Sequence, residues 1–154
     1  RQDNQLIYKP IKKNKMKKYI KLLIFLATIL TSHNAMAQAD TLLNFCASHL
    51  PSSYISDGQL YRTPLSKEET AEFNVTFYGE TIYRVAACSG TTDGNLIFTI
   101  YDKSHNELFA SADHKNTPYW DFKFNSTVDC IIEAQLDNLA PESGIAIILI
   151  GFKQ

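Results

Sequence analysis

An alternation of apolar and polar residues between Asn95 and Asn125 is the feature that most limits what this chain can fold into. In its clearest part, the segment YWDFKFN, Trp120, Phe122 and Phe124 fall on one side and polar residues on the other. A period of two is typical of a strand with one face on a core and one in water. The alternation therefore predicts β-structure with this face on a core, and exposure of all three aromatic side chains would refute a sandwich.

The same period recurs along the chain after Pro51, with turn residues separating the apolar runs at intervals of about ten residues. The final run, IAIILI at residues 145–150, is apolar on both faces, which is typical of a central strand. We therefore expect an all-β fold, an antiparallel, jelly-roll-like β-sandwich of about eight strands. The predicted inward-facing sets are Phe73, Val75 and Phe77; Tyr83, Val85 and Ala87; Leu96, Phe98 and Ile100; and Val128, Cys130, Ile132, Ala134 and Leu136.

One short helix precedes the predicted strands, at about residues 40–50 (DTLLNFCASHL). Asp40 is the expected N-cap, and Pro51 ends the helix. Leu42, Cys46 and Leu50 belong to its broad apolar stripe. A helix this short is stable only when it packs on the rest of a domain, so the stripe is expected to be core.

The residues before this helix have the order of a secretory signal peptide. A basic start follows Met16, an apolar run follows at residues 22–30, and Ala35 and Ala37 flank Met36 in a small-x-small ending. The run is shorter than the roughly 20 residues that cross a bilayer, so we expect cleavage after Ala37 rather than a membrane anchor. Residues 1–15 are either upstream sequence or a long basic n-region. The predicted organisation is therefore residues 1–37, upstream segment and signal peptide, followed by a single domain at residues 38–154.

Removal of residues 1–37 would leave 154 − 37 = 117 residues, the size of one domain. It would also leave 15 − 8 = 7 basic and 16 − 1 = 15 acidic residues, because eight basic residues and one acidic residue lie in the leader. Such an acidic balance argues against nucleic-acid binding. We expect a periplasmic or secreted protein of Gram-negative type, with no membrane span after cleavage.

Three cysteines, Cys46, Cys88 and Cys130, lie beyond the predicted cleavage site. Two of them can pair in an oxidising compartment, and three pairings are possible. Cys88 and Cys130 both fall in predicted strands, where a bridge would join two sheets if the sulfur atoms approach closely enough. None of the three has a second cysteine or a histidine at metal-ligand spacing, so no metal site is predicted from them.

Three segments after residue 80 carry a resemblance to a known family. The order TIYRVAAC (residues 81–88), LIFTIYD (96–102) and ELFAS (107–111) resembles the bacterial pre-peptidase C-terminal domain. The wider stretch from about residue 70 to residue 154 is similar to small secreted proteins of Gram-negative bacteria. The resemblance implies a β-sandwich and no activity, and no functional residue of that family is carried over to this chain.

Residues that could carry catalysis are scattered. There is no G-x-S-x-G motif, and His105 and His114 lie in polar loops while His49 lies near the helix end. Acidic residues in the turns match no calcium-loop spacing. We therefore predict no catalytic residue, no metal and no cofactor.

Tyrosines on the polar side of strands or near turns are the best remaining signal for function. Tyr119, Tyr101 and Tyr78 are the candidate ligand-binding residues, because exposed tyrosines anchor proteins and stack on sugars. The loops 102–106 and 113–118 lie close to two of them. The predicted function is a non-catalytic exported module that binds or supports a protein or glycan outside the cytoplasm. Alternatives are a carbohydrate-binding module, a structural subunit of an envelope assembly and a small hydrolase.

Overall fold

The computed structural model describes residues 34–153, and side chains from residue 40 onward. Most of the predicted upstream segment and signal peptide, residues 1–37, lies outside the described residues. The chain divides into two compact units at residues 1–38 and 39–154, and the following description concerns the second unit. The predicted domain of residues 38–154 and the cleavage site after Ala37 stay predictions.

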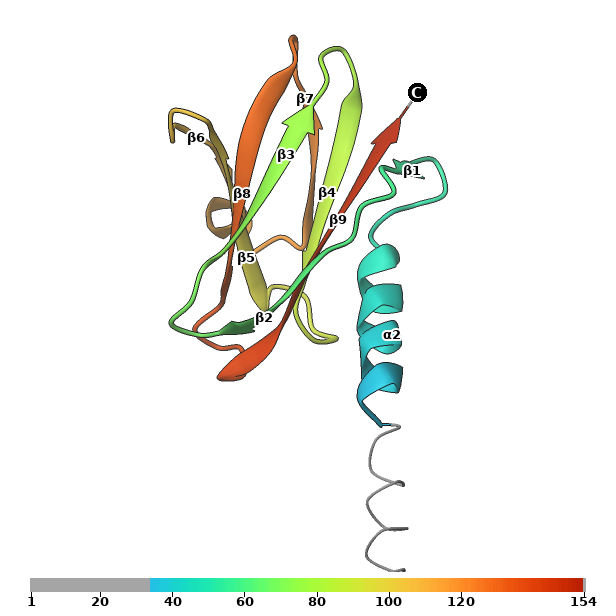
Figure 1. Ribbon diagram of the computed structural model, residues 1–154, viewed down its shortest axis with the longest axis vertical. Helices are drawn as coiled ribbons and strands as arrows, with labels where there is room; N and C mark the ends of the chain where they lie inside the picture. Colours follow the sequence, from blue (N-terminus) through green and yellow to red (C-terminus); the bar gives the residue numbers. More distant parts are fainter. Residues whose placement is uncertain (1–33, 154) are drawn as a thin grey trace, which may run out of the picture. The chain divides into compact units, whose positions relative to one another are not determined.

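Two antiparallel sheets form the β-sandwich, which confirms the predicted all-β fold (Figure 1). In one sheet, here sheet A, β9 pairs with β4, which pairs with β7, while β1 and β2 pair with the other side of β9. In the second sheet, sheet B, the strand order is β3-β8-β5-β6. The described residues hold nine strands where about eight were predicted. Their bounds are β1 (Ile55–Ser56), β2 (Tyr61–Ser66), β3 (Ala71–Phe77), β4 (Ile82–Cys88), β5 (Leu96–Asp102), β6 (Glu107–Ala110), β7 (Tyr119–Lys123), β8 (Val128–Leu136) and β9 (Ser143–Lys153).

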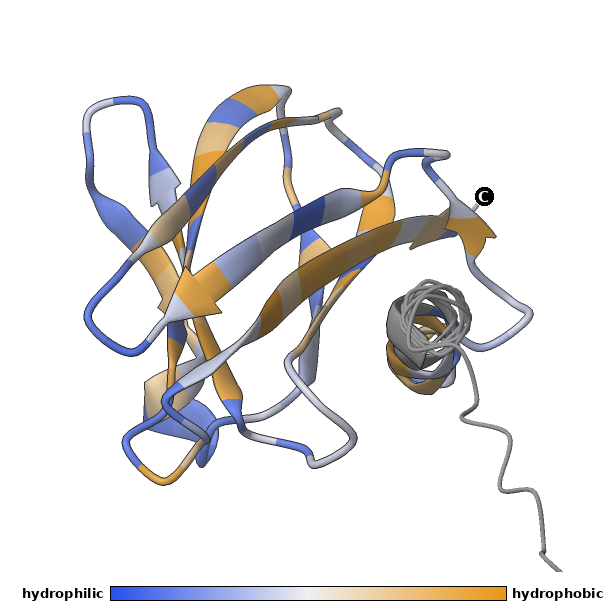
Figure 2. Ribbon diagram, turned by 60° about the horizontal axis from the view of Figure 1, so that its bottom comes forward, coloured by the Kyte–Doolittle hydropathy of each residue, from blue (hydrophilic) through white to orange (hydrophobic). Residues whose placement is uncertain are grey.

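The core lies between the two sheets and is built from the predicted inward-facing residues. Phe77, Phe98 and Ile132 are fully buried there, and Figure 2 shows the alternation as bands of apolar and polar residues along the strands. Phe122 and Phe124 are half-buried against this core. The condition that would have refuted the sandwich is therefore not met.

Strand β9 is central, as its apolar sequence predicted. It pairs with β4 along one side and with β1 and β2 along the other. Ile148 and Ile150 belong to the core between the sheets, whereas Ile147 and Leu149 belong to a second apolar cluster on the opposite face of sheet A. Both faces of β9 are therefore covered, which explains why its sequence does not alternate.

The helix α2 (Asn34–Ala47) covers that second cluster with Leu42 and Cys46. It begins earlier and ends earlier than the predicted helix at residues 40–50. Asp40 lies inside the helix, so its assignment as the N-cap was wrong; alanine, methionine and glutamine before it are strong helix formers. Within the described residues, no helix has the length and apolarity needed to span a membrane.

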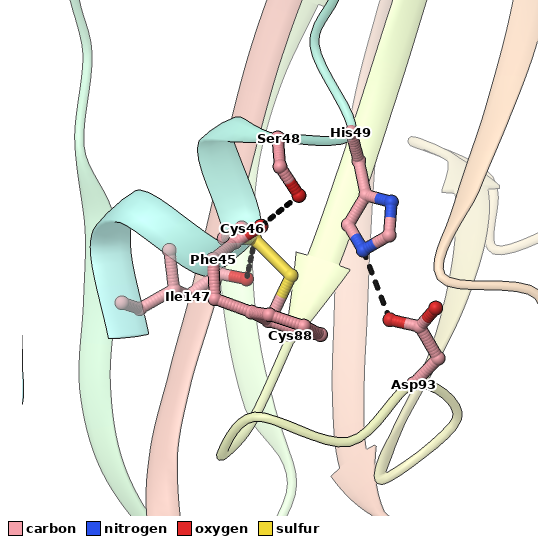
Figure 3. The surroundings of a disulfide bond; sticks show 7 residues. All are labelled: Phe45, Cys46, Ser48, His49, Cys88, Asp93 and Ile147. Atoms are coloured by element: carbon pink, nitrogen blue, oxygen red, sulfur yellow. Dashed lines mark hydrogen bonds and ion pairs between the residues drawn. A yellow bond between two sulfur atoms is a disulfide. The ribbon is translucent and has the colours of Figure 1, made fainter. Parts of the chain in front are cut away.

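A disulfide joins α2 to sheet A and corrects the predicted pairing of Cys88 with Cys130. Cys46 and Cys88 are bonded, with their Cα atoms 5.7 Å apart (Figure 3). Cys88 lies on the face of sheet A that contacts α2, whereas Cys130 is a free, buried thiol between the sheets. Because successive side chains in a strand point to opposite faces, Cys88 cannot point both toward α2 and toward Cys130.

Candidate binding site

The three predicted ligand-binding tyrosines lie in different parts of the sandwich. Tyr119 is on β7 of sheet A and is 37% exposed. Tyr101 is on β5 of sheet B, where its ring stacks on that of His105. Tyr78 follows β3 and is 64% exposed. The three side chains therefore do not form a row on one sheet.

Tyr119 belongs to a cluster organised by Arg84 on β4. The Arg84 guanidinium lies over the rings of Tyr119 and Tyr54, 4.4 Å and 4.8 Å from their centroids. Its Nε and Nη2 donate to the two carboxylate oxygens of Asp121 at 2.6 Å and 2.8 Å, and Nη1 donates to the His49 carbonyl at 3.2 Å. Arg84 is thus held on several sides, and it fixes the Tyr119 ring by cation–π attraction.

The register of β4 and β7 explains the pairing of Arg84 with Asp121, because these two residues lie directly opposite each other. Hydrogen bonds from Arg84, which favour the charged carboxylate, hold the pKa of Asp121 below its usual range. The same hydrogen bonds raise the pKa of Arg84. The ion pair therefore remains charged at neutral pH and leaves little free positive charge for a ligand.

His49 extends this cluster toward the loop after β4. Its Nε2 is 2.9 Å from Asp93 Oδ1 (Figure 3). The centroid of its ring is 5.6 Å from that of the Tyr119 ring. His49 follows α2 by two residues, so the disulfide at Cys46 holds it near sheet A.

Trp120 points to the other face of β7 from Tyr119. Its ring lies 4.3 Å from that of His114 and 5.2 Å from that of Phe109, and it is 37% exposed. A hollow of about 280 Å³ is lined by Tyr119, Trp120 and Asp121. Tyr119 and Trp120 point to opposite faces of β7, because neighbouring side chains of a strand alternate. A hollow that both of them line therefore lies along the edge of the strand.

That edge also carries backbone groups without a strand partner, since β7 pairs with β4 and with no other described strand. One of them, the Tyr119 carbonyl, accepts a hydrogen bond from the Thr117 hydroxyl at 2.9 Å. The Ala87 N–H donates to the Pro118 carbonyl at 2.8 Å. In an antiparallel pair, alternate residues turn their backbone groups toward and away from the partner. The outward-pointing set therefore comprises Tyr119, Asp121 and Lys123. We call the outward backbone of these residues, together with the Tyr119 and Trp120 rings, the β7 edge.

The described residues offer little for catalysis. They contain no group of three or more His, Cys, Asp or Glu side chains that could hold a metal ion. The pair of His49 and Asp93 has the geometry of a base with its orienting acid, but the neighbouring Ser48 hydroxyl donates to the Phe45 carbonyl and Cys46 is in the disulfide.

The two loops singled out from the sequence have structural roles. In the first, Asp102 accepts hydrogen bonds from the Ser104 and Asn106 backbone N–H groups and from the Asn106 side chain, which closes the turn before β6. In the second, the Asn116 side chain donates to Asp137. The 3₁₀-helix η1 (Ser111–His114) opens the second loop and supplies the His114 ring, which packs at a tilt against Trp120.

Sequence reasoning missed Arg84, and among the three possible disulfides it favoured Cys88–Cys130 over the observed Cys46–Cys88. Arg84 lies in the alternating segment TIYRVAAC, but its partner Asp121 lies 37 residues away in another strand. The charge of Arg84 on an otherwise apolar strand was the available signal. Its meaning depends on which strand lies beside β4.

Comparisons with known proteins identify no family for this chain. No protein-family model matches it, and no curated protein sequence is significantly similar to it. Among solved structures, it is similar to the crystal structure of Aeromonas hydrophila PliG, a periplasmic lysozyme inhibitor of g-type lysozyme. The two share 7% sequence identity with a TM-score of 0.48, and the match covers 62% of this chain and 85% of that chain. A likeness of this extent identifies no function.

Proposed function

We propose that this protein is an exported, non-catalytic β-sandwich module that binds a protein partner outside the cytoplasm through the β7 edge. The observation that carries the proposal is a pair of exposed aromatic rings, Tyr119 and Trp120, held rigid beside an unpaired strand edge. An edge of this kind binds an extended segment of another chain as an additional strand.

The rigidity of the two rings supports this proposal. Arg84 packs against Tyr119, while His114 and Phe109 pack against Trp120. Tyrosine and tryptophan side chains fixed before binding lose little conformational entropy, and they are enriched among residues that dominate binding energy. The acidic excess of residues 38–154 favours a partner segment that carries lysine or arginine.

A glycan is the second candidate partner, and one observation favours it. The hollow of about 280 Å³ along the β7 edge combines two aromatic rings with the Asp121 carboxylate. Aromatic faces pack on the C–H groups of sugars, and a carboxylate accepts hydrogen bonds from sugar hydroxyls.

The test is capture of binding partners from an envelope extract and on a glycan array, with wild-type protein and with the variants Tyr119→Ala and Trp120→Ala. Tyr101→Ala is the matched control, because Tyr101 lies on sheet B. We expect each β7-edge variant to weaken binding at least about tenfold, a loss of about 1.4 kcal/mol, and the control to bind like wild type.

Hydrogen exchange of the bound protein separates the two candidates. Strand addition slows exchange of the outward N–H groups of Tyr119, Asp121 and Lys123, whereas a glycan seated on the rings leaves these amides unchanged. Equal loss of binding in the Tyr101→Ala control, or unchanged binding in both β7-edge variants, would refute the assignment of this surface.

A further inference from the structure

A second concavity, whose lining residues differ from those of the β7 edge, lies between the two sheets. Its volume is about 380 Å³, within the range of small-molecule sites. The apolar part of its lining comes from Val75 of β3 in sheet B and from Ile150 and Phe152 of β9 in sheet A, with the Tyr83 ring beside them. We call this concavity the inter-sheet cleft.

One carboxylate, that of Asp57, lines the inter-sheet cleft. Asp57 follows β1 directly, and its N–H donates to the Ile150 carbonyl at 3.0 Å. It continues the register in which Ser56 lies opposite Gly151, so it lies opposite Ile150. Side chains opposite each other in an antiparallel pair share a face, so Asp57 points to the same side as the buried Ile150.

The Asp57 carboxylate is half-buried and lacks a cationic partner among the described residues. Its Oδ1 accepts the Gln59 N–H at 2.9 Å, which leaves Oδ2 for a ligand. Burial raises the pKa of Asp57. The pKa of Tyr61 is also raised, first by its own burial and second by the negative charge of Asp57. A carboxylate in this position is stabilised by a nearby cation, and the described residues do not supply one.

We propose that the inter-sheet cleft binds a small amphipathic amine, with its ammonium group at Asp57 and its apolar body against Val75, Ile150 and Phe152. The lining explains this choice of ligand class. Apolar walls bind a hydrocarbon or aromatic body, and one unpaired carboxylate at their border selects a positive charge over a neutral or negative group. Exposed Tyr78, which also lines the cleft, is placed to cover the bound ligand.

Three probes of nearly equal shape test this proposal: phenethylamine, phenethyl alcohol and phenylacetate. Each is titrated at pH 7 into the purified full chain, with affinities from calorimetry and the binding position from NMR shifts of cleft residues. We expect phenethylamine to bind at least about tenfold more tightly than the alcohol, a difference of about 1.4 kcal/mol. Phenylacetate should bind most weakly, because its carboxylate is repelled by Asp57.

The variant Asp57→Asn keeps an oxygen that can accept the Gln59 N–H, and a thermal melt verifies that it folds. We expect it to bind the amine and the alcohol equally. Asp113→Asn is the control, since Asp113 is an exposed acid on η1 and should leave the tenfold preference intact. The proposal would be overturned if the wild type bound phenethylamine and phenethyl alcohol with equal affinity, or if the preference for the amine survived in Asp57→Asn. It would also be overturned if the NMR shifts fell on residues outside the cleft. An absence of shifts with all three probes at about 10 mM, a concentration that should reveal even millimolar affinities, would overturn it as well.

Discussion

Removal of the bond between Cys46 and Cys88 tests how the helix is held on sheet A. The two cysteines are 42 residues apart in the sequence. In the chain-entropy model, a cross-link over a loop of this length destabilises the unfolded ensemble by about 4 kcal/mol at 25 °C. Reduction of the bond should therefore lower the free energy of unfolding by the same amount. For a folded unit of this size, this corresponds to a decrease of roughly 15 °C in the midpoint of thermal unfolding.

The assay is equilibrium unfolding in urea of the oxidised protein and of the protein reduced with dithiothreitol. Cys88 and Cys130 are also 130 − 88 = 42 residues apart, so the size of the effect alone cannot identify the pair. Single variants can. We expect Cys130→Ala to retain the difference of about 4 kcal/mol between oxidised and reduced protein, and Cys46→Ala to abolish it.

The opposite pattern would refute the geometry described for the two faces of β4. If Cys130→Ala removed the sensitivity to reductant and Cys46→Ala kept it, Cys88 would have to point between the sheets. A difference below about 1 kcal/mol in the wild type would instead refute the estimate from loop length. Peptide mapping of the non-reduced protein by mass spectrometry identifies the pair independently.

Three further perturbations test the core and the Arg84 cluster. The buried Ser111 hydroxyl accepts the Phe98 N–H at 2.9 Å, so Ser111→Ala should cost about 1–3 kcal/mol in urea unfolding, and an unchanged midpoint would contradict this. The pKa of Asp121 is lower in the folded than in the unfolded protein, so its ionised carboxylate stabilises the fold at pH values above the unfolded-state pKa of about 3.9. This stabilisation is lost as the pH falls through the folded-state pKa. In Asp121→Asn, the free energy of unfolding should therefore decrease less steeply as the pH is lowered. Burial raises the pKa of Cys130 to about 11, so the native thiol should resist iodoacetamide at pH 8 and react only after unfolding, as followed by mass spectrometry.

The strands and their inward faces could be predicted from the sequence because both depend on a local property. Side chains alternate across a strand regardless of its neighbours, so the faces of Phe98, Ile132 and Val75 follow from spacing alone. The central place of β9 followed for the same reason, because only a strand covered on both faces is apolar at every position.

The helix shows where local reasoning was incomplete. Its apolar stripe was assigned to the core, and Leu42 and Cys46 are buried against sheet A. Its start was not predicted, because a favourable N-cap residue such as Asp40 does not end a helix that good helix formers continue.

The candidate sites depended on contacts between residues far apart in the chain. Period-two spacing assigns Cys88 to a face, but only the position of α2 determines that Cys46 lies opposite it. Likewise, Asp121 neutralises Arg84 only because β7 lies beside β4 in one register. A shift of one residue would move every side chain of β7 to the other face.

The sequence by itself therefore determined the fold class and, where apolar and polar residues alternate, the face on which the apolar residues lie, because these follow from short-range periodicity. Only the tertiary structure decided which strands are neighbours, which cysteines are bonded and where unpaired groups remain. The β7 edge and the Asp57 carboxylate in the inter-sheet cleft exist because strands distant in sequence pack into two sheets of finite width. The free energies that select such packing are sums over many long-range contacts, and no short segment of the sequence contains them.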